Sequence, residues 1–218
     1  MLEGMIYIMR TGCPWRDLPA DYGPWSSVYT RWRRWNQTGI WQRLIRVLAR
    51  KARGRLRFLD ASHIKVHQDG SNPAGGQQNQ AMGRTKGGLN TKLTALIDIR
   101  GRAVRIGLAP GQAADVKVAT PVLGRLAAKT ILVADKGYDT NQFRRRLKQR
   151  QARVCIPSKS NRVTPIAHHR GYYRLRHKAE NFFQRIKKFR RIGTRYEKLD
   201  AHFQGFIALA VILDWLRR

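Results

Sequence analysis

Five apolar runs, and the order in which they follow one another, limit the folds open to this chain. They predict strands at residues 56–67, 91–99, 103–108, 131–134 and 153–156. The second and third runs are joined at Arg100-Gly101, which is a hairpin signal. A meander of three strands followed by strand–helix units predicts an α/β domain with a mixed five-stranded sheet flanked by helices. That is the pattern of the RNase H-like fold, and other α/β folds share it.

Helical patterns lie between and after these runs. Helices are expected from Asp115 to about Ala128, after a cap at Thr140 or Asn141, and at Gly171–Arg191 and Asp200–Arg217. Pro121 predicts a kink or a late start in the first of them. Residues 68–90 are rich in Gly, Gln, Asn and Ser and predict a flexible loop.

The first 53 residues predict a small all-helical segment. Helices are expected at Gly4–Arg10, Ser26–Trp35 and Ile40–Lys51, with Ser26 or Ser27 as the N-cap of the second. Apolar and basic residues interleave along the last two helices. Two interpretations stay open: a partial helix-turn-helix-like DNA-binding segment at 1–53 preceding a catalytic domain at 54–218, or a plain helical cap on that domain.

The charge of the chain points to its partner. Its 44 Lys and Arg against 13 Asp and Glu give a net charge of +31. A field this positive favours a polyanion, and nucleic acid is the usual one. A solvated basic surface without a role is the plainer alternative.

Cysteine usage and hydropathy indicate the compartment. Cys13 and Cys155 lie far apart and fit no metal spacing, which is typical of reduced thiols in an intracellular protein. The longest apolar run, Phe206–Leu213, is far shorter than the roughly 20 residues of a membrane span. No signal peptide is recognisable. We therefore expect a cytoplasmic protein located on DNA, with no membrane partner.

Acids are scarce, with ten Asp and three Glu, so each one that lies near a DNA-binding face needs a reason. Asp60 lies inside an apolar strand, where Asp is unfavourable and an unpaired carboxylate is costly. Asp135 follows directly on the apolar run 131–134, at the carboxyl end where α/β sheets place their sites. If the two strands are neighbours, both carboxylates meet at one place. Otherwise, Asp60 pairs with an Arg and Asp135 caps a turn.

A third acid lies on the helix expected at 171–191. At 100° per residue, Tyr173, Arg176, Glu180 and Lys187 fall within about 60° of one another on one stripe. Phe182, Phe183, Ile186 and Phe189 form the arc that faces the core. Glu180 is thus the only acid of this helix, at the apolar edge and among cations. This placement suits a carboxylate that binds a metal while neighbouring cations hold phosphates.

Cutting a phosphodiester explains why three carboxylates would be kept. Two Mg²⁺ ions about 3.5–4 Å apart can activate the attacking oxygen and stabilise the leaving oxygen. Mg²⁺ prefers oxygen ligands and retains waters, so three carboxylates suffice. For His63, His67 and His177, which lie near these acids in sequence, a metal-binding role and a plain surface role both stay open.

The motifs around these acids resemble those of bacterial insertion-sequence transposases of the IS5 group, within the IS4-like superfamily. Tyr173-x2-Arg176-x3-Glu180-x6-Lys187 matches the superfamily's Y-x2-R-x3-E-x6-K signature at every position. LDAS at 59–62 and ADKGYD at 134–139 are similar to its first and second catalytic Asp motifs. GRTKGGLNTK at 83–92 and TGCPWRDLP at 11–19 resemble further family segments. The resemblance covers nearly the whole chain.

The resemblance implies a DDE transposase of the bacterial nucleoid. Asp60, Asp135 and Glu180 would bind two Mg²⁺ or Mn²⁺ ions, water would cut at the transposon ends, and the freed 3′-hydroxyl would attack target DNA. DNA contacts are expected from Tyr173, Arg176, Lys187, Lys136, Arg84, Lys86, Arg31 and Arg34. The expected partners are terminal inverted repeats, target DNA and a second copy of the chain in a homodimer on DNA.

One departure from the family pattern leaves alternatives open. Family members usually carry a further stretch before the piece that matches Leu2–Arg10, so the chain resembles an N-terminally shortened member. A truncated remnant, the product of an alternative start and half of a frameshifted pair all stay open. A catalytically dead or truncated remnant that only binds DNA accounts equally well for the charge, although it does not explain why all three acids persist. A structure-specific nuclease on the same fold is the third interpretation.

Overall fold

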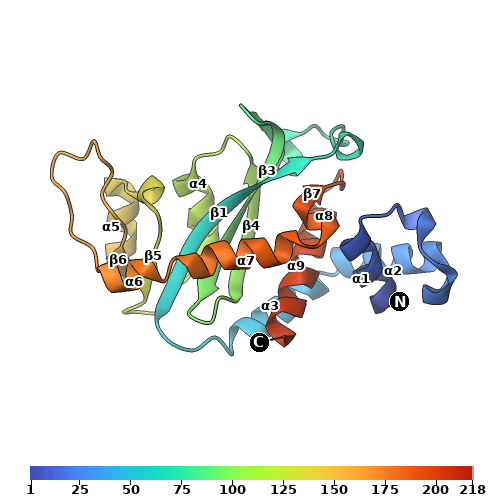
Figure 1. The fold of residues 1–218 in the computed structure, drawn as a ribbon, viewed down its shortest axis with the longest axis horizontal. Helices are drawn as coiled ribbons and strands as arrows, with labels where there is room; N and C mark the ends of the chain where they lie inside the picture. The colour runs from blue at the N-terminus through green and yellow to red at the C-terminus, as the bar shows by residue number, and fades with distance from the viewer. Residues whose placement is uncertain (218) are drawn as a thin grey trace.

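The computed structural model describes residues 1–217 and has a mixed sheet at its centre (Figure 1). Its strands are β1 (Leu56–Val66), β2 (Gly83–Thr85), β3 (Gly88–Asp98), β4 (Ala103–Pro110), β5 (Ile131–Val133), β6 (Arg153–Cys155) and β7 (Thr194–Arg195). The five main strands lie in the order β4-β3-β1-β5-β6. β1, β5 and β6 are parallel, whereas β3 is antiparallel to both β1 and β4. The predicted mixed five-stranded sheet is confirmed.

Helices pack against the strands of this sheet. They are α1 (Leu2–Thr11), α2 (Trp25–Gln37), α3 (Ile40–Ala49), α4 (Asp115–Leu123), α5 (Asn141–Gln149), α6 (Arg170–Arg174), α7 (His177–Lys187), α8 (Arg190–Gly193) and α9 (Asp200–Leu216). α7 crosses β1 and β3 on the side that faces the viewer in Figure 1. α9 packs behind it and is buried along most of its length, since its sequence is apolar on nearly every side.

The N-terminal helices share the core of the sheet domain. α1 packs on α8, and α3 packs on both α9 and β4. Trp32 of α2 is fully buried and stacks on Phe206 of α9, with ring centroids 4.2 Å apart. Residues 1–49 therefore cap one end of the molecule, opposite the end formed by α5 and β6 (Figure 1).

Two helix boundaries differ from the predictions. Ser26 and Ser27 do not cap α2, because the helix already begins at Trp25 after Pro24, whose fixed φ suits a helix start. α4 starts at Asp115 as expected but ends at Leu123 instead of about Ala128. Pro121 removes one backbone donor from the last turn, and Gly124 then turns the chain with a φ of +47°.

The region expected as a loop at 68–90 contains a hairpin formed by β2 and the start of β3, with Thr85 opposite Gly88. This hairpin shows no alternation of apolar and polar residues, and side-chain hydrogen bonds stabilise it. Nδ2 of the buried Asn90 donates to Oγ1 of Thr85 at 2.6 Å and to the Gly88 carbonyl at 3.0 Å. Gly88 adopts a φ of +93°, which favours glycine.

The helix expected at 171–191 is divided into α6, α7 and α8. Near Leu175 and Arg176 the backbone amides bond to the carbonyls three residues earlier, which tightens the helix for one turn. Phe189 is extended and separates α7 from α8. Within residues 1–217, no helix is long and apolar enough to cross a membrane.

Candidate active site

Strand pairing brings the two predicted aspartates together. β1 and β5 are parallel neighbours, with Phe58 opposite Val133. Asp60 and Asp135 each lie two residues beyond that pair, so their side chains leave the sheet on the same side. Asp60 is largely buried, with 14% of its side chain exposed, and its Oδ1 accepts a hydrogen bond from the Ala61 amide at 2.9 Å.

Arg176 joins the helix to the sheet between two of the predicted metal ligands. Its Nη1 donates to Oδ2 of Asp60 at 3.1 Å, and its Nη2 donates to Oε1 of Glu180 one turn further along. The tight turn before α7 places Arg176 over β1. The side chain expected to hold phosphate is therefore engaged with two carboxylates.

The charges in this cluster do not balance around Asp60. Burial, together with the charges of Asp135 and Glu180, raises the pKa of Asp60 to about 6, against the lowering effect of the Ala61 amide and Arg176. Burial opposes the charged form of Arg176, but Asp60, Glu180 and Asp135 raise its pKa overall. One guanidinium is thus too little positive charge for three neighbouring carboxylates.

Asp135 lies in a tight turn, where its Oδ1 accepts a hydrogen bond from the Gly137 amide at 2.8 Å. Tyr138, in the same turn, is buried, and burial together with the charges of Asp115, Asp60 and Asp135 raises its pKa. Asp115 in turn pairs with the buried Lys92 at 2.7 Å. The sequence carries no local signal for Asp115 and Lys92 as neighbours of Asp135, because the packing of α4 on β3 brings them together.

Lys187 lies further along the same face of α7. Its Nζ donates to Oγ of Ser62 at 2.7 Å and to the His63 carbonyl at 2.9 Å. Burial lowers its pKa. Nδ1 of His63 lies 2.8 Å from Oδ1 of Asn90, so this histidine belongs to the side-chain network of the strands.

The remaining predicted DNA contacts are spread over the surface. Lys136 is exposed directly beside Asp135. Tyr173 lies half-buried on α6, one turn before Arg176. Arg84 and Lys86 are exposed on the β2–β3 hairpin, whereas Arg31 and Arg34 are exposed on α2 in the N-terminal cap (Figure 1). Of the predicted DNA contacts, Arg176 therefore bonds to two of the acids and Lys187 bonds to Ser62 and His63 of β1, whereas Arg84, Lys86, Arg31 and Arg34 lie on other elements.

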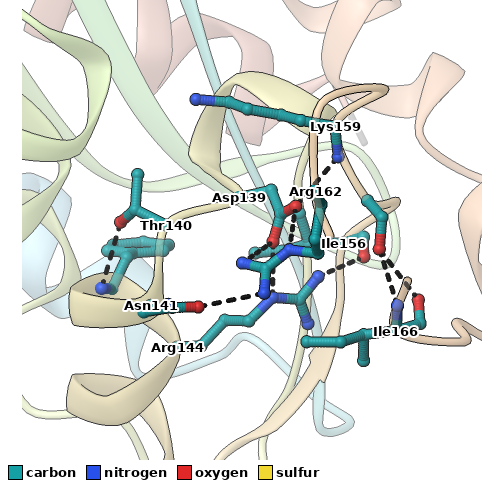
Figure 2. Close-up of polar contacts among 10 residues, drawn as sticks. Asp139, Thr140, Asn141, Arg144, Ile156, Lys159, Arg162 and Ile166 are labelled. Atoms are coloured by element: carbon teal, nitrogen blue, oxygen red, sulfur yellow. Dashed lines mark hydrogen bonds and ion pairs between the residues drawn. The ribbon is translucent and has the colours of Figure 1, made fainter. Parts of the chain in front are cut away.

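Asp139, four residues after Asp135, fixes the chain that leads from β6 to α6. Its side chain is fully buried and accepts hydrogen bonds from Arg144 at 2.6 Å, from Nε and Nη2 of Arg162 at 2.7 and 2.9 Å, and from the Lys159 amide at 2.9 Å (Figure 2). These bonds outweigh the effect of burial and hold the pKa of Asp139 well below its usual range. The segment that precedes the Glu180 helix is thus tied to the turn that follows Asp135.

The donor set suits a hard divalent cation, since it consists of carboxylates that lack compensating positive charge. Their present spacing is wider than a bound ion requires: among residues 1–217, no three His, Cys, Asp or Glu side chains are placed to hold one metal ion. Arg176 occupies the space between Asp60 and Glu180. Metal binding at this site therefore requires the guanidinium to move.

Known proteins are similar to this chain over most of its length. Residues 51–215 match the family described as "Transposase DDE domain", and residues 1–45 match "Putative transposase of IS4/5 family". The chain is 35% identical over 139 residues to the putative transposase for insertion sequence element IS6501 of Brucella ovis, covering 59% of this chain and all of that protein. It is 46% identical over 55 residues to an uncharacterized 16.2 kDa protein of insertion element IS402 of Burkholderia cepacia, covering 24% of this chain and 37% of that protein.

Among solved structures, a pre-cleavage Mos1 transpososome is similar over 99% of this chain and 76% of that one, with 14% identity and a TM-score of 0.31. The family matches together span both the helical cap and the sheet domain. The chain belongs to the DDE transposases of the IS4/5 family.

Proposed function

We propose that this chain cuts DNA at transposon ends and joins the freed 3′-hydroxyl to target DNA, with Asp60, Asp135 and Glu180 as its catalytic residues. The observation that carries the proposal is that acids from three elements lie near one another. Asp60 lies on β1, Asp135 follows the neighbouring strand β5, and Glu180 on α7 is linked to Asp60 through Arg176. A protein that only bound DNA would gain from losing these acids, because they repel phosphate.

Asp60, Asp135 and Glu180 would hold two Mg²⁺ or Mn²⁺ ions. When bound, such ions activate the attacking oxygen and stabilise the leaving oxygen of the phosphodiester. The raised pKa of Asp60 supports the fit, because a buried carboxylate that is short of positive charge gains most from a cation.

The chain's own cations would orient the DNA. If released from Asp60, the guanidinium of Arg176 would hold a phosphate through two parallel hydrogen bonds. Lys187, which is bonded to Ser62, and Lys136, which is exposed next to Asp135, would hold the flanking phosphates, and Tyr173 would pack against the DNA backbone. Arg84, Lys86, Arg31 and Arg34 would contact DNA further from the cut, and two copies of the chain would act together on paired ends.

The test compares Asp60→Asn with wild type on DNA that carries the inverted repeats flanking the gene. We expect Mg²⁺-dependent cutting by the wild type, and DNA binding without cutting by the variant. Asp21→Asn, an exposed acid in the helical cap, is the matched control and should cut normally. Cutting by Asp60→Asn at the wild-type rate would remove Asp60 from the site.

A second assay separates a transposase from a nuclease on the same fold. It supplies a pre-cut end with a free 3′-hydroxyl together with target DNA. A transposase joins the two, whereas a nuclease leaves them separate.

A further inference from the structure

The stretch that leads from α3 into β1 is densely basic. It carries five cations in eight residues, which are Arg50, Lys51, Arg53, Arg55 and Arg57. A run of like charge repels itself and is typical of segments that meet an oppositely charged partner. Here the run is tied to the sheet, because the Arg55 carbonyl accepts a hydrogen bond from the Ile131 amide at 2.9 Å. The stretch lies at the bottom of Figure 1, where β1 begins.

Strand pairing brings further cations to the same place. The Lys129 amide, just before β5, donates to the Gln151 carbonyl at 2.9 Å, and the Arg153 amide, at the start of β6, donates to the Thr130 carbonyl at 2.7 Å. The amino ends of β1, β5 and β6 therefore meet at one edge of the sheet. We call it the basic edge, and its exposed cations are Arg50, Lys51, Arg53, Arg55, Arg125, Lys129 and Arg153.

No acid balances the charge of this edge. Within residues 1–217, none of its seven exposed cations forms an ion pair with a carboxylate. Asp98, the acid whose charge acts on Arg57, is fully buried and bonded to Arg102 at 2.7 Å. The positive field of the basic edge is thus left for a polyanion to neutralise.

A pocket of about 170 Å³ is sunk into the basic edge, between the stretch before β1 and the loop after α4. Four arginines line it, and none of its lining residues is an acid: they include Arg55, Arg57, Arg105 and Arg125. Arg105 donates to the Leu123 carbonyl and, at 3.0 Å, to the Arg125 carbonyl, so it fixes the loop that carries Arg125.

Arg57 is half-buried in this pocket with part of its guanidinium unused. Its Nη1 donates to the carbonyls of Gly54 and Leu56 at 3.0 and 2.9 Å. In the part of the chain that the structure describes, its Nε and Nη2 have no partner. Burial lowers the pKa of Arg57, against the raising effect of Asp98. A half-buried cation without a paired acid gains from a bound anion, and the planar guanidinium suits the oxygens of a phosphate.

The basic edge and the acids lie at opposite ends of the strands. Asp60 follows Arg55 by five residues on β1, which separates them by roughly 16 Å at the rise of a strand. Asp135 likewise follows the carboxyl end of β5, whereas the basic edge lies at the amino end. A DNA segment on the acids therefore leaves the basic edge free for another.

We propose that the basic edge binds the backbone phosphates of a second DNA segment, separate from the one at the acids, with one phosphate in the pocket between Arg55, Arg57 and Arg125. Such contacts carry no sequence information and weaken as salt is raised. The proposal rests on the DNA binding of the proposed function and is independent of cutting.

The first test counts the short duplexes of arbitrary sequence that bind to each chain, in EDTA, by sedimentation of the whole chain with labelled DNA. We expect the wild type to bind one duplex more than the double variant Arg55→Gln, Arg125→Gln. Arg43→Gln with Arg46→Gln is the matched control, because it removes the same charge from exposed positions of α3 and should bind as many duplexes as the wild type.

The outcomes separate this proposal from the proposed function. Equal numbers of duplexes on the wild type and on the Arg55, Arg125 variant overturn the basic edge and leave the cutting chemistry standing. Loss of one duplex from the control variant as well overturns it too, since charge anywhere on the surface would then suffice. Failure of the wild type to bind any duplex overturns both proposals, whereas the expected numbers without cutting overturn only the proposed function.

A measurement on the wild-type chain needs no variant to fold. Phenylglyoxal modifies guanidinium groups, and mass spectrometry of the peptides gives the rate at each arginine. Saturating DNA should protect Arg55 and Arg125 and leave the rate at Arg43 unchanged. Rates at Arg55 and Arg125 that are the same with and without DNA contradict the proposal.

Discussion

Replacing Asp139 by Asn removes one negative charge from a fully buried site that holds two arginines (Figure 2). The amide keeps one acceptor but turns an NH₂ group toward donors that the carboxylate now satisfies. Breaking a buried ion pair on one side typically costs 3–5 kcal/mol, so we expect a loss of about 3 kcal/mol in the free energy of unfolding at neutral pH.

The pH dependence follows from the depressed pKa of Asp139. In the unfolded chain this carboxyl titrates at about 3.9, so its contribution is fully present above that pH. It is lost as the pH falls toward the lower pKa of the folded state, since the folded chain then binds fewer protons than the unfolded one. The gap between wild type and variant should therefore shrink by about 1 kcal/mol between pH 7 and pH 3.

Urea unfolding followed by tryptophan fluorescence measures both gaps, with Asp21→Asn as the exposed control. Hydrogen exchange should show residues 157–169 less protected in Asp139→Asn, because Arg162 and the Lys159 amide lose their anchor. A variant within about 0.5 kcal/mol of wild type at pH 7, a change typical of surface substitutions, would refute the reasoning. A gap that stays constant down to pH 3 would refute the electrostatic part of it.

Three further outcomes are expected. The affinity for Mn²⁺, measured by calorimetry, should fall as the pH drops below about 6. Burial raises the pKa of Asp60 to about 6, so protonation of this carboxylate then competes with the metal. An affinity that is constant between pH 5 and pH 8 contradicts this expectation. Trp32→Ala should lower the free energy of unfolding by about 3–5 kcal/mol, since this fully buried ring joins the cap to α9. The exposed Trp25 should tolerate the same change. Equal losses for the two variants in urea unfolding would contradict a core shared by the cap and the sheet domain. DNA affinity should fall steeply with salt as phosphate counterions are released, and a slope near zero in anisotropy titrations counts against the basic surface.

Most of the sheet was predictable because its strands carry their own signals. The runs that became β1, β3, β4, β5 and β6 are apolar and bounded by turn residues, so local pattern and tertiary structure agree. The β2–β3 hairpin was not predictable, because Asn90 stabilises it through side-chain hydrogen bonds that produce no periodic pattern in the sequence.

The site was predictable only in part for a related reason. Helical periodicity places Arg176, Glu180 and Lys187 on one stripe, but it does not say what that stripe meets. Packing on β1 decides that Arg176 contacts Asp60 and that Lys187 contacts Ser62. The contribution of Asp115 depends on the contact of α4 with β3, for which no local pattern exists.

Binding of Mn²⁺ to the DNA-bound chain, followed by electron paramagnetic resonance, tests the metal site most directly. We expect the wild type and Asp21→Asn to take up two ions, and Asp60→Asn, Asp135→Asn and Glu180→Gln each to lose at least one. Uptake of two ions by all three variants, with wild-type affinity, would show that these carboxylates do not form the metal centre.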